Sequence, residues 1–233
     1  MKIALLGYGK MGKAIEAIAI QRGHTIVIKT SQQSDYDITQ ADVAIDFSIP
    51  SAAFGNISNC INNQVPVISG TTGWLDKYDN IISLCETKKG AFIYASNFSL
   101  GVNIFFELNQ LLAKMMAKVE DYKIDIEEIH HTQKLDAPSG TAITLAEGII
   151  KNNANVDAWR LDQTDDKTIP IIAKRIPEVP GTHTITYTSP IDTIKIEHEA
   201  HSRQGFALGA VIAAEWLVGK TGVFTMKDVL NIG

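Results

Sequence analysis

The sequence predicts an α/β protein of two domains: a doubly wound parallel sheet, then an α+β domain with a mixed or antiparallel sheet. Up to residue 100, short apolar segments alternate with helical patterns, the order that produces a parallel sheet with crossover helices. Later strand-like segments are joined by links too short for helical crossovers, which favours antiparallel or mixed pairing. We expect residues 1–100, completed by residues 208–233, to form the first domain and residues 101–207 to form the second.

The composition narrows the classes of partner. The chain has 233 residues, of which 45% are apolar and 20% charged, and its net charge is −5. This fits a soluble globular protein without a basic block, so no nucleic-acid partner is expected. The apolar segment before Gly7 is too short for a signal peptide, and no segment reaches the length of a membrane span. We therefore expect no membrane partner. Cys60 and Cys85 form no CxxC pair and suggest no disulfide framework, so we expect a protein of the reducing cytoplasm.

The first predicted strand, residues 2–6, runs into a glycine motif. Residues 7–12, GYGKMG, have the spacing G-x-G-x-x-G and are followed by a helical pattern. Gly7 permits a tight turn, Gly9 lets the backbone approach a pyrophosphate, and Gly12 lets helix and strand pack closely. In this position the motif favours dinucleotide binding on a Rossmann-type domain. The alternative is a glycine turn with only a structural role.

The second predicted strand, residues 25–28, ends where the ribose of an adenosine would lie. Sites specific for NAD usually carry an acidic residue there, which binds the 2′-hydroxyl. Here the chain reads Lys29-Thr30-Ser31 and has no acid until Asp35. A lysine and two hydroxyls suit a 2′-phosphate, so we expect NADPH as the cofactor, with NADH as the alternative. Lys29 could equally be a solvated side chain.

Further turns follow the next predicted strands, at the edge where open α/β sheets bind ligands. A strand at residues 43–46 leads into Phe47, and helices are expected at 51–62 and 76–88. The strand at 65–69 ends in Gly70, Thr71, Thr72 and Gly73, and the strand at 91–95 ends in Ser96, Asn97, Phe98 and Ser99. We expect these turns to face the glycine motif.

The second domain begins with a helix, because the apolar stripe from Ile104 to Met116 has helical spacing typical of core packing. The pattern then predicts a strand at 123–129, a helix at 139–150, a loop over 152–167, and strands at 169–173, 182–188 and 193–200. We expect a last helix at 204–218 and an apolar tail at 222–230 to rejoin the first domain.

A short segment after the strand at 123–129 offers proton donors. It holds the adjacent imidazoles of His130 and His131 and the ammonium of Lys134. Such groups suit protonation of an anionic substrate. The alternative for each residue alone is a surface histidine pair or a solvated lysine. No metal site is expected, because the two histidines are adjacent and neither cysteine has a His or Cys at ligand spacing.

The start of the next helix adds an anion site. Ser139 is a good N-cap residue, so the amides of Gly140 and Thr141 would point out of a positive helix end. Such an end suits a carboxylate. Gly140 could also be a helix-start glycine and nothing more.

Residues 128–142, EIHHTQKLDAPSGTA, resemble the signature of the 4-hydroxy-tetrahydrodipicolinate reductases, also called dihydrodipicolinate reductases. Further motifs of that family match in order at residues 7–12, 45–48, 70–73, 97–102, 206–211 and 220–230. The resemblance spans nearly the whole chain. It implies an oxidoreductase that uses NAD(P)H to reduce a cyclic imine dicarboxylate to tetrahydrodipicolinate, in the diaminopimelate route to lysine.

The resemblance also implies roles for single residues. His130 would donate or accept a proton and Lys134 would donate one; His131, Gly140 and Thr141 would contact the substrate. Thr72 would hold nicotinamide and substrate together. With the strand-end arguments, the expected cofactor contacts are Gly7, Tyr8, Gly9, Lys10, Met11, Gly12, Lys29, Phe47, Gly70, Thr71, Thr72, Ala95, Ser96, Asn97 and Phe98.

Two features depart from the family pattern. The segment after the second strand is short, so its ribose-binding residue is not identifiable, and the loop at 175–181 is proline-rich where many relatives are glycine-rich. The resemblance implies a homotetramer built around the second domain, where Ile185, Tyr187, Ile194 and Ile196 form an apolar alternation that could extend across subunits. The alternative functions are a nucleotide-sensing binding protein without catalysis, and another two-domain dehydrogenase acting on an aldehyde or a sugar.

Overall fold

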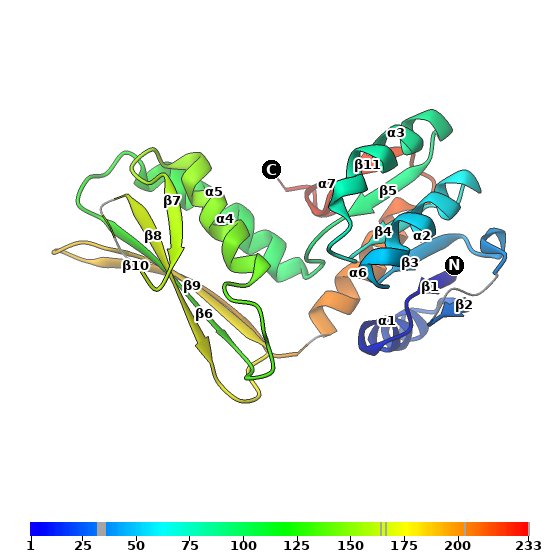
Figure 1. Cartoon of the computed structure of the whole chain (residues 1–233), viewed down its shortest axis with the longest axis horizontal. Coiled ribbons are helices and arrows are strands. Elements are labelled where there is room, and N and C mark those ends of the chain that lie inside the picture. Colours follow the sequence, from blue (N-terminus) through cyan, green and yellow to red (C-terminus); the bar gives the residue numbers. More distant parts are fainter. Residues whose placement is uncertain (32–35, 164, 166, 203, 233) are drawn as a thin grey trace. The chain divides into compact units, whose positions relative to one another are not determined.

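The structure, a computed structural model, describes residues 1–31, 36–163, 165, 167–202 and 204–232 (Figure 1). Its internal contacts divide the chain into two compact units. Unit 1 is Met1–Leu100 together with Arg203–Gly233, and unit 2 is Gly101–Ser202. No helix among the described residues is both long enough and apolar enough to cross a membrane.

Unit 1 is a six-stranded sheet in the order β11-β5-β4-β3-β1-β2, and every neighbouring pair is parallel. Its strands are β1 (Lys2–Leu6), β2 (Thr25–Thr30), β3 (Val43–Asp46), β4 (Val67–Ser69), β5 (Ala91–Tyr94) and β11 (Gly222–Phe224). The helices are α1 (Lys10–Gln21), α2 (Pro50–Asn62), α3 (Tyr78–Lys88), α6 (Gln204–Leu217) and α7 (Met226–Leu230), with short 3-10 turns η1 (Ile38–Gln40) and η2 (Leu75–Lys77). The strand order reverses between β1 and β3, so the predicted doubly wound sheet is confirmed, with its switch point at these two strands.

Alternating side chains of β1 enter two separate cores, one on each face of the sheet. Ile3 and Leu5 pack with α1 and α6, whereas Ala4 and Leu6 pack with α2 and α3. This period of two is why the buried strands read as continuous apolar runs. Both cysteines are free and lie in the second of these cores, where burial raises the pKa of the Cys60 thiol. A buried, protonated thiol is a poor nucleophile, which disfavours the cysteine-dependent aldehyde chemistry considered above.

The C-terminal segment is integral to unit 1. Helix α6 approaches the chain after β5 so closely that a Cβ on Gly209 would lie 1.7 Å from the carbonyl oxygen of Phe98. After α6, β11 adds a parallel strand beside β5, and the ring of Trp216 packs on Phe224 at 5.1 Å between centroids. Glycine at position 209 is therefore what allows α6 to pack against this sheet edge.

Unit 2 is a five-stranded mixed sheet in the order β10-β9-β6-β8-β7. Its strands are β6 (Lys123–His130), β7 (Ala158–Leu161), β8 (Thr168–Arg175), β9 (Gly181–Thr188) and β10 (Thr193–Ala200), and its helices are α4 (Leu100–Met116) and α5 (Gly140–Asn152). β9 runs antiparallel to β6 and β10, while β6, β8 and β7 are mutually parallel. The parallel β6–β8 pair is possible because α5 and β7 lie between these two strands in the chain. The predicted α+β domain with a mixed sheet is confirmed.

Strand β7 corrects the expectation of a loop over 152–167. Residues Ala158–Leu161 pair with β8 in parallel, at the edge of the sheet. Trp159 and Leu161 are only half-buried and Arg160 is exposed, so the segment has no clean apolar alternation. Pairing with a neighbouring strand, which local pattern does not reveal, determines its conformation.

The apolar alternation expected to reach across subunits belongs instead to the core of unit 2. The side chains of Ile185 and Tyr187 are both 0% exposed. They belong to one buried cluster that also contains residues of α4 and α5. Ile196 packs against the same cluster, and Ile194 is 37% exposed. The expectation was wrong for Ile185 and Tyr187, because the sequence does not show which face of β9 the helices cover.

Candidate active site

The turn between β1 and α1 is shaped by close backbone contacts. Gly7 has φ +103°, and a Cβ there would lie 2.0 Å from the carbonyl oxygen of Phe47. A Cβ on Gly12 would lie 2.3 Å from the carbonyl oxygen of Gly7. By contrast, a Cβ on Gly9, the N-cap residue of α1, would meet nothing within 4 Å. Two glycines thus hold the turn against its neighbours, and the third leaves space beside the first amides of α1, which begins at Lys10.

A hollow of about 230 Å³ lies beside this turn. Its lining comes from α1 and from the ends of β3 and β4: Met11, Phe47, Ser48, Pro50, Gly70, Thr71 and Thr72. A Cβ on Gly70 would lie 2.3 Å from the ring of Phe47, and that ring lies 5.7 Å from the ring of Phe98. The structure therefore brings together residues that the sequence placed at three different strand ends.

A buried carboxylate that the sequence reading missed, Asp46, ties two of these strand ends together. Its Oδ2 accepts hydrogen bonds from the hydroxyls of Ser69 (2.8 Å) and Thr71 (2.7 Å). Its Oδ1 accepts from the Ser48 hydroxyl (2.7 Å) and the Asn56 amide (2.9 Å). Burial raises the pKa of Asp46, and these four donors oppose that rise. The network fixes Thr71 next to Thr72 at the rim of the hollow.

The turn after β5 is stabilised by a hydrogen bond to the side chain of Asn97. The side-chain oxygen of Asn97 accepts from the backbone N–H of Ser99 at 2.9 Å, and the N–H of Ala95 donates to the carbonyl of Ser69 at 3.2 Å. Ser96 is exposed and Phe98 is buried. These residues extend the same sheet edge from β4 to β5.

Lys29 lies near the end of β2, where its side chain is 41% exposed but paired. Its ammonium is 2.5 Å from Glu16 Oε1 and 5.1 Å from the centre of the Tyr8 ring, and the Tyr8 hydroxyl donates to the same carboxylate. The hydrogen bond to Glu16 raises the pKa of Lys29. The sequence reading missed Glu16, because the acid comes from α1 and not from the end of β2. Asp35, the acid noted in the sequence, lies outside the described residues.

In unit 2, the buried face of β6 changes from apolar to polar residues along the strand. Its alternation places Ile124 and Ile126 on the buried face, followed by Glu128 and His130 on the same face. His183 on β9 is directly opposite Glu128, and Arg175 on β8 is directly opposite His130. The end of the sheet therefore carries a polar cluster where the rest of that face carries a core.

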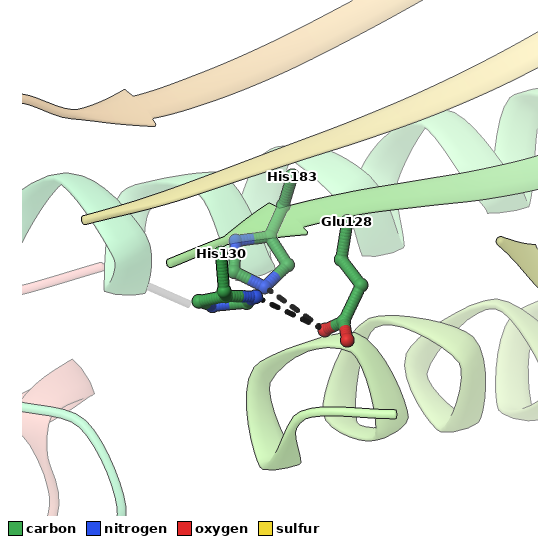
Figure 2. A group of neighbouring side chains, drawn as sticks. All are labelled: Glu128, His130 and His183. Carbon is green, nitrogen blue, oxygen red and sulfur yellow. Dashed lines mark ion pairs between the residues drawn. The ribbon is translucent and has the colours of Figure 1, made fainter. Parts of the chain in front are cut away.

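The cluster contains two imidazoles beside one carboxylate (Figure 2). His130 Nδ1 and His183 Nε2 lie 3.7 and 3.8 Å from Glu128 Oε2, and the two rings are 5.1 Å apart. Burial lowers the pKa of His130, although the charge of Glu128 acts in the opposite direction. Burial lowers the pKa of His183 to about 3. The sequence analysis missed His183, which lies 53 positions after His130 in the chain. The two residues come together only because β9 pairs with β6.

Lys134 and His131 lie in the irregular segment after β6. The Lys134 ammonium binds both oxygens of Asp136, at 2.9 and 2.7 Å, and its side chain is 21% exposed. The bond to Lys134 holds the pKa of Asp136 below its ordinary value. His131 is half-buried, directly after the last residue of β6. The lysine is therefore held in place by a neighbouring carboxylate that is itself exposed to solvent.

Helix α5 begins as the sequence indicates. The Ser139 hydroxyl accepts from the N–H of Ala142 at 3.1 Å and lies 3.1 Å from His183 Nε2. Gly140 and Thr141 are the first two residues of the helix, and Gly140 is exposed. The Gly140 N–H is the first amide of the helix, and the positive end of a helix can bind an anion.

Glu128, His130 and His183 are the described residues whose ligand atoms approach within 4.8 Å of one another, close enough to hold a metal ion. The expectation of no metal site considered the adjacent His130 and His131 and the spacing of the two cysteines, but not this set. Both oxygens of Glu128 already accept hydrogen bonds, from the Ser139 N–H at 3.0 Å and from Arg175 at 3.3 Å. The guanidinium of Arg175 already lies beside the carboxylate, which disfavours a second cation there.

Comparison with known proteins follows the same division of the chain. A family model described as the N-terminus of dihydrodipicolinate reductase matches residues 1–98, and one described as its C-terminus matches residues 101–230. A 4-hydroxy-tetrahydrodipicolinate reductase of Christiangramia forsetii is 61% identical over 99% of this chain and 98% of its own length. One from Neisseria meningitidis serogroup B is 35% identical over 93% of this chain and 84% of its own length.

A solved structure has the same fold. The dipicolinate-bound dihydrodipicolinate reductase from Paenisporosarcina sp. TG-14 superposes with a TM-score of 0.80 at 23% identity, over 97% of both chains. An aspartate semialdehyde dehydrogenase from Vibrio cholerae is more distant, with a TM-score of 0.52 and 12% identity over 92% of this chain and 97% of its own.

Proposed function

The chain belongs to the dihydrodipicolinate reductase family, and we propose how its two units divide the work of that family's reaction. The protein is an NAD(P)H-dependent oxidoreductase that reduces a cyclic imine dicarboxylate to tetrahydrodipicolinate, in the diaminopimelate route to lysine. The observation that carries this assignment is 61% identity to a reductase of that name over nearly the full chain.

Unit 1 would hold the coenzyme, and its residues fit one. The space beside Gly9 and the first amides of α1 would accommodate a pyrophosphate. The hollow lined by Phe47 and Gly70–Thr72 continues from there, and we assign Ala95–Phe98 to the same edge. When bound, the nicotinamide supplies the hydride. Thr72, exposed at the rim, would contact both nicotinamide and substrate.

Unit 2 would supply protons. Hydride addition to a C=C–C=N system moves negative charge toward nitrogen, so an acid is needed there. The Lys134 ammonium is the stronger candidate for the donor. Because burial lowers the pKa of His130, its imidazole is largely neutral and would accept or relay a proton. The amides of Gly140 and Thr141, with His131, would bind a substrate carboxylate.

The function is tested by following NADPH absorbance after adding freshly generated hydroxylated precursor of dihydrodipicolinate. We expect absorbance loss that depends on both substrate and enzyme. Binding of NADPH without turnover would favour the nucleotide-sensing alternative, and turnover only with an aldehyde or a sugar would favour the other dehydrogenases.

We predict that NADPH is accepted at least as well as NADH. Among the described residues at the end of β2, Lys29 supplies the cation, but its ammonium is already paired with Glu16. Lys29→Ala should therefore lower kcat/KM for NADPH by roughly five- to tenfold, the range of one partly exposed charge-assisted bond, with NADH nearly unchanged. Glu16→Gln should shift the ratio toward NADPH, because it frees the ammonium. A tenfold preference of the parent enzyme for NADH would contradict the assignment.

We predict that the first amide of α5 binds substrate. Gly140→Pro deletes that N–H, and proline is tolerated at the first position of a helix. Ser139 already has the extended backbone that a following proline requires (φ −68°, ψ 154°), and a Cβ at Gly140 meets nothing within 4 Å. KM for the dicarboxylate should rise about tenfold with little change in kcat, since a carboxylate is equally charged before and during hydride transfer. Gly140→Ala, which keeps the amide, is the matched control and should behave like the parent.

We also propose a cytoplasmic homotetramer assembled through unit 2. Support comes from the family resemblance and from the free, buried cysteines, which fit a reducing compartment. The assembly face would not use Ile185 and Tyr187, which lie in the core. Light scattering at micromolar concentration should give four times the chain mass, and a monomer would contradict the assembly.

A further inference from the structure

Glu128 is a carboxylate with a fully buried side chain, and its partners come from two other elements. Its Oε2 accepts from the N–H of Ser139, at the start of α5, at 3.0 Å. Its Oε1 accepts from both terminal nitrogens of Arg175, at the end of β8, at 3.4 and 3.3 Å. A buried carboxylate is unfavourable unless such partners compensate it. The carboxylate therefore links α5 and β8 at one point.

Arg175 extends this link to the segment that carries Lys134. Its Nε donates to the carbonyl of Lys134 at 3.3 Å, and its Nη2 donates to the carbonyl of Asp136 at 2.7 Å. The guanidinium is a rigid, planar fork, so these bonds and the pair with Glu128 are made in one fixed geometry. The backbone on both sides of Leu135 is thus bound to the end of β8.

Residues 131–138 form neither helix nor strand, yet both of their ends are fixed. The C-terminal end is held by the bond from Ser139 to Glu128, and the middle by Arg175, which Glu128 also binds. The segment carries the ammonium of Lys134 in its middle and leads into the N-terminus of α5. One buried ion pair therefore sets the distance between a proton donor and a carboxylate site.

We propose that Glu128 and Arg175 are positioning residues for the reduction: they act on the substrate only through Lys134 and the start of α5. The proposal rests on the proton role proposed for Lys134. Catalysis by proton transfer depends on donor placement, and a misplacement of about 1 Å can cost a factor of about 100. Without the pair, an irregular segment would let the ammonium move relative to the carboxylate that α5 binds.

The decisive variant is Arg175→Lys, which keeps the positive charge beside Glu128 but loses the fork that binds the two carbonyls. We expect kcat to fall about 10- to 100-fold, with KM for NADPH unchanged. In a Lys134→Ala background the same substitution should have little further effect, because the group it positions is gone. A residue that only stabilises the fold would lower kcat by the same factor in both backgrounds, and that result would overturn the proposal, as would a parental kcat.

Hydrogen exchange tests the same idea without turnover, so it separates this proposal from the assigned reaction. Peptides covering residues 131–139 should exchange faster in Arg175→Lys and in Glu128→Gln than in the parent. Glu127→Gln is the matched control: Glu127 pairs with Lys174 at 2.5 Å, between the same two strands on the opposite face. Exchange should be unchanged in the control. An exchange rate in Arg175→Lys equal to that of the parent would overturn the proposal. A parent enzyme that does not reduce the substrate would instead count against the assigned function.

Discussion

Lys134→Ala should lower kcat about 100- to 10,000-fold, the usual cost of removing a general acid. The ring nitrogen of the substrate gains charge only as hydride arrives, so its proton donor acts mainly in the transition state. Lys134 also lies near the proposed carboxylate site, so a smaller rise in KM is expected. Lys151→Ala, which removes an exposed lysine from the last turn of α5, should leave kcat near the parental value.

His130→Ala should produce a loss in the same range, because it removes the group proposed to accept or relay the proton. If the two residues act as one unit, the double variant should lose less than the product of the single losses. The measurement is kcat at saturating substrate, with folding checked by circular dichroism. Near-parental kcat in both single variants would show that the proton comes from elsewhere.

Local pattern was sufficient for most of the fold. The parallel sheet of unit 1 follows from alternation of apolar strands and helices. The turn at Gly7 follows from a motif in which contacts under 3 Å require glycine at positions 7 and 12. The cap at Ser139 also follows from sequence, because capping involves residues only three positions apart. These features depend on neighbours in the chain, which a single sequence displays.

The missed features depend on partners distant in sequence. Arg175 and Glu128 are 47 positions apart and meet only because β6 and β8 are neighbours with a particular register. Glu16 binds Lys29 because α1 packs beside β2, so the search for an acid after β2 could not find it. The face of β9 that holds Tyr187 is likewise fixed by where the helices lie. A period of two predicts which residues share a face but not which face is covered.

His183 should make unit 2 sensitive to acid. Burial lowers its pKa to about 3 from the usual 6.5, and the positive charges of His130, His198 and Lys134 act in the same direction. The carboxylate of Glu128 faces it at 3.8 Å, and the Ser139 hydroxyl at 3.1 Å. Between these two pKa values the unfolded chain binds a proton that the folded chain excludes. Stability is therefore fully present above pH 6.5 and falls as the pH drops toward 3.

The size of the effect follows from the same two values. The free energy of unfolding should fall by about 2 kcal/mol at pH 5 and about 4 kcal/mol at pH 3 from this residue alone. His183→Gln removes the titrating group but keeps a polar side chain, so the difference in stability between pH 7.5 and pH 5 should shrink by most of that amount. The measurement is a denaturant titration in which unfolding is followed by hydrogen exchange of peptides from β6 and β9. These peptides report on the stability of unit 2 and not on that of unit 1. His201→Gln, at an exposed position, is the control and should retain the parental dependence. An unchanged dependence in His183→Gln would mean that groups other than His183 govern acid unfolding.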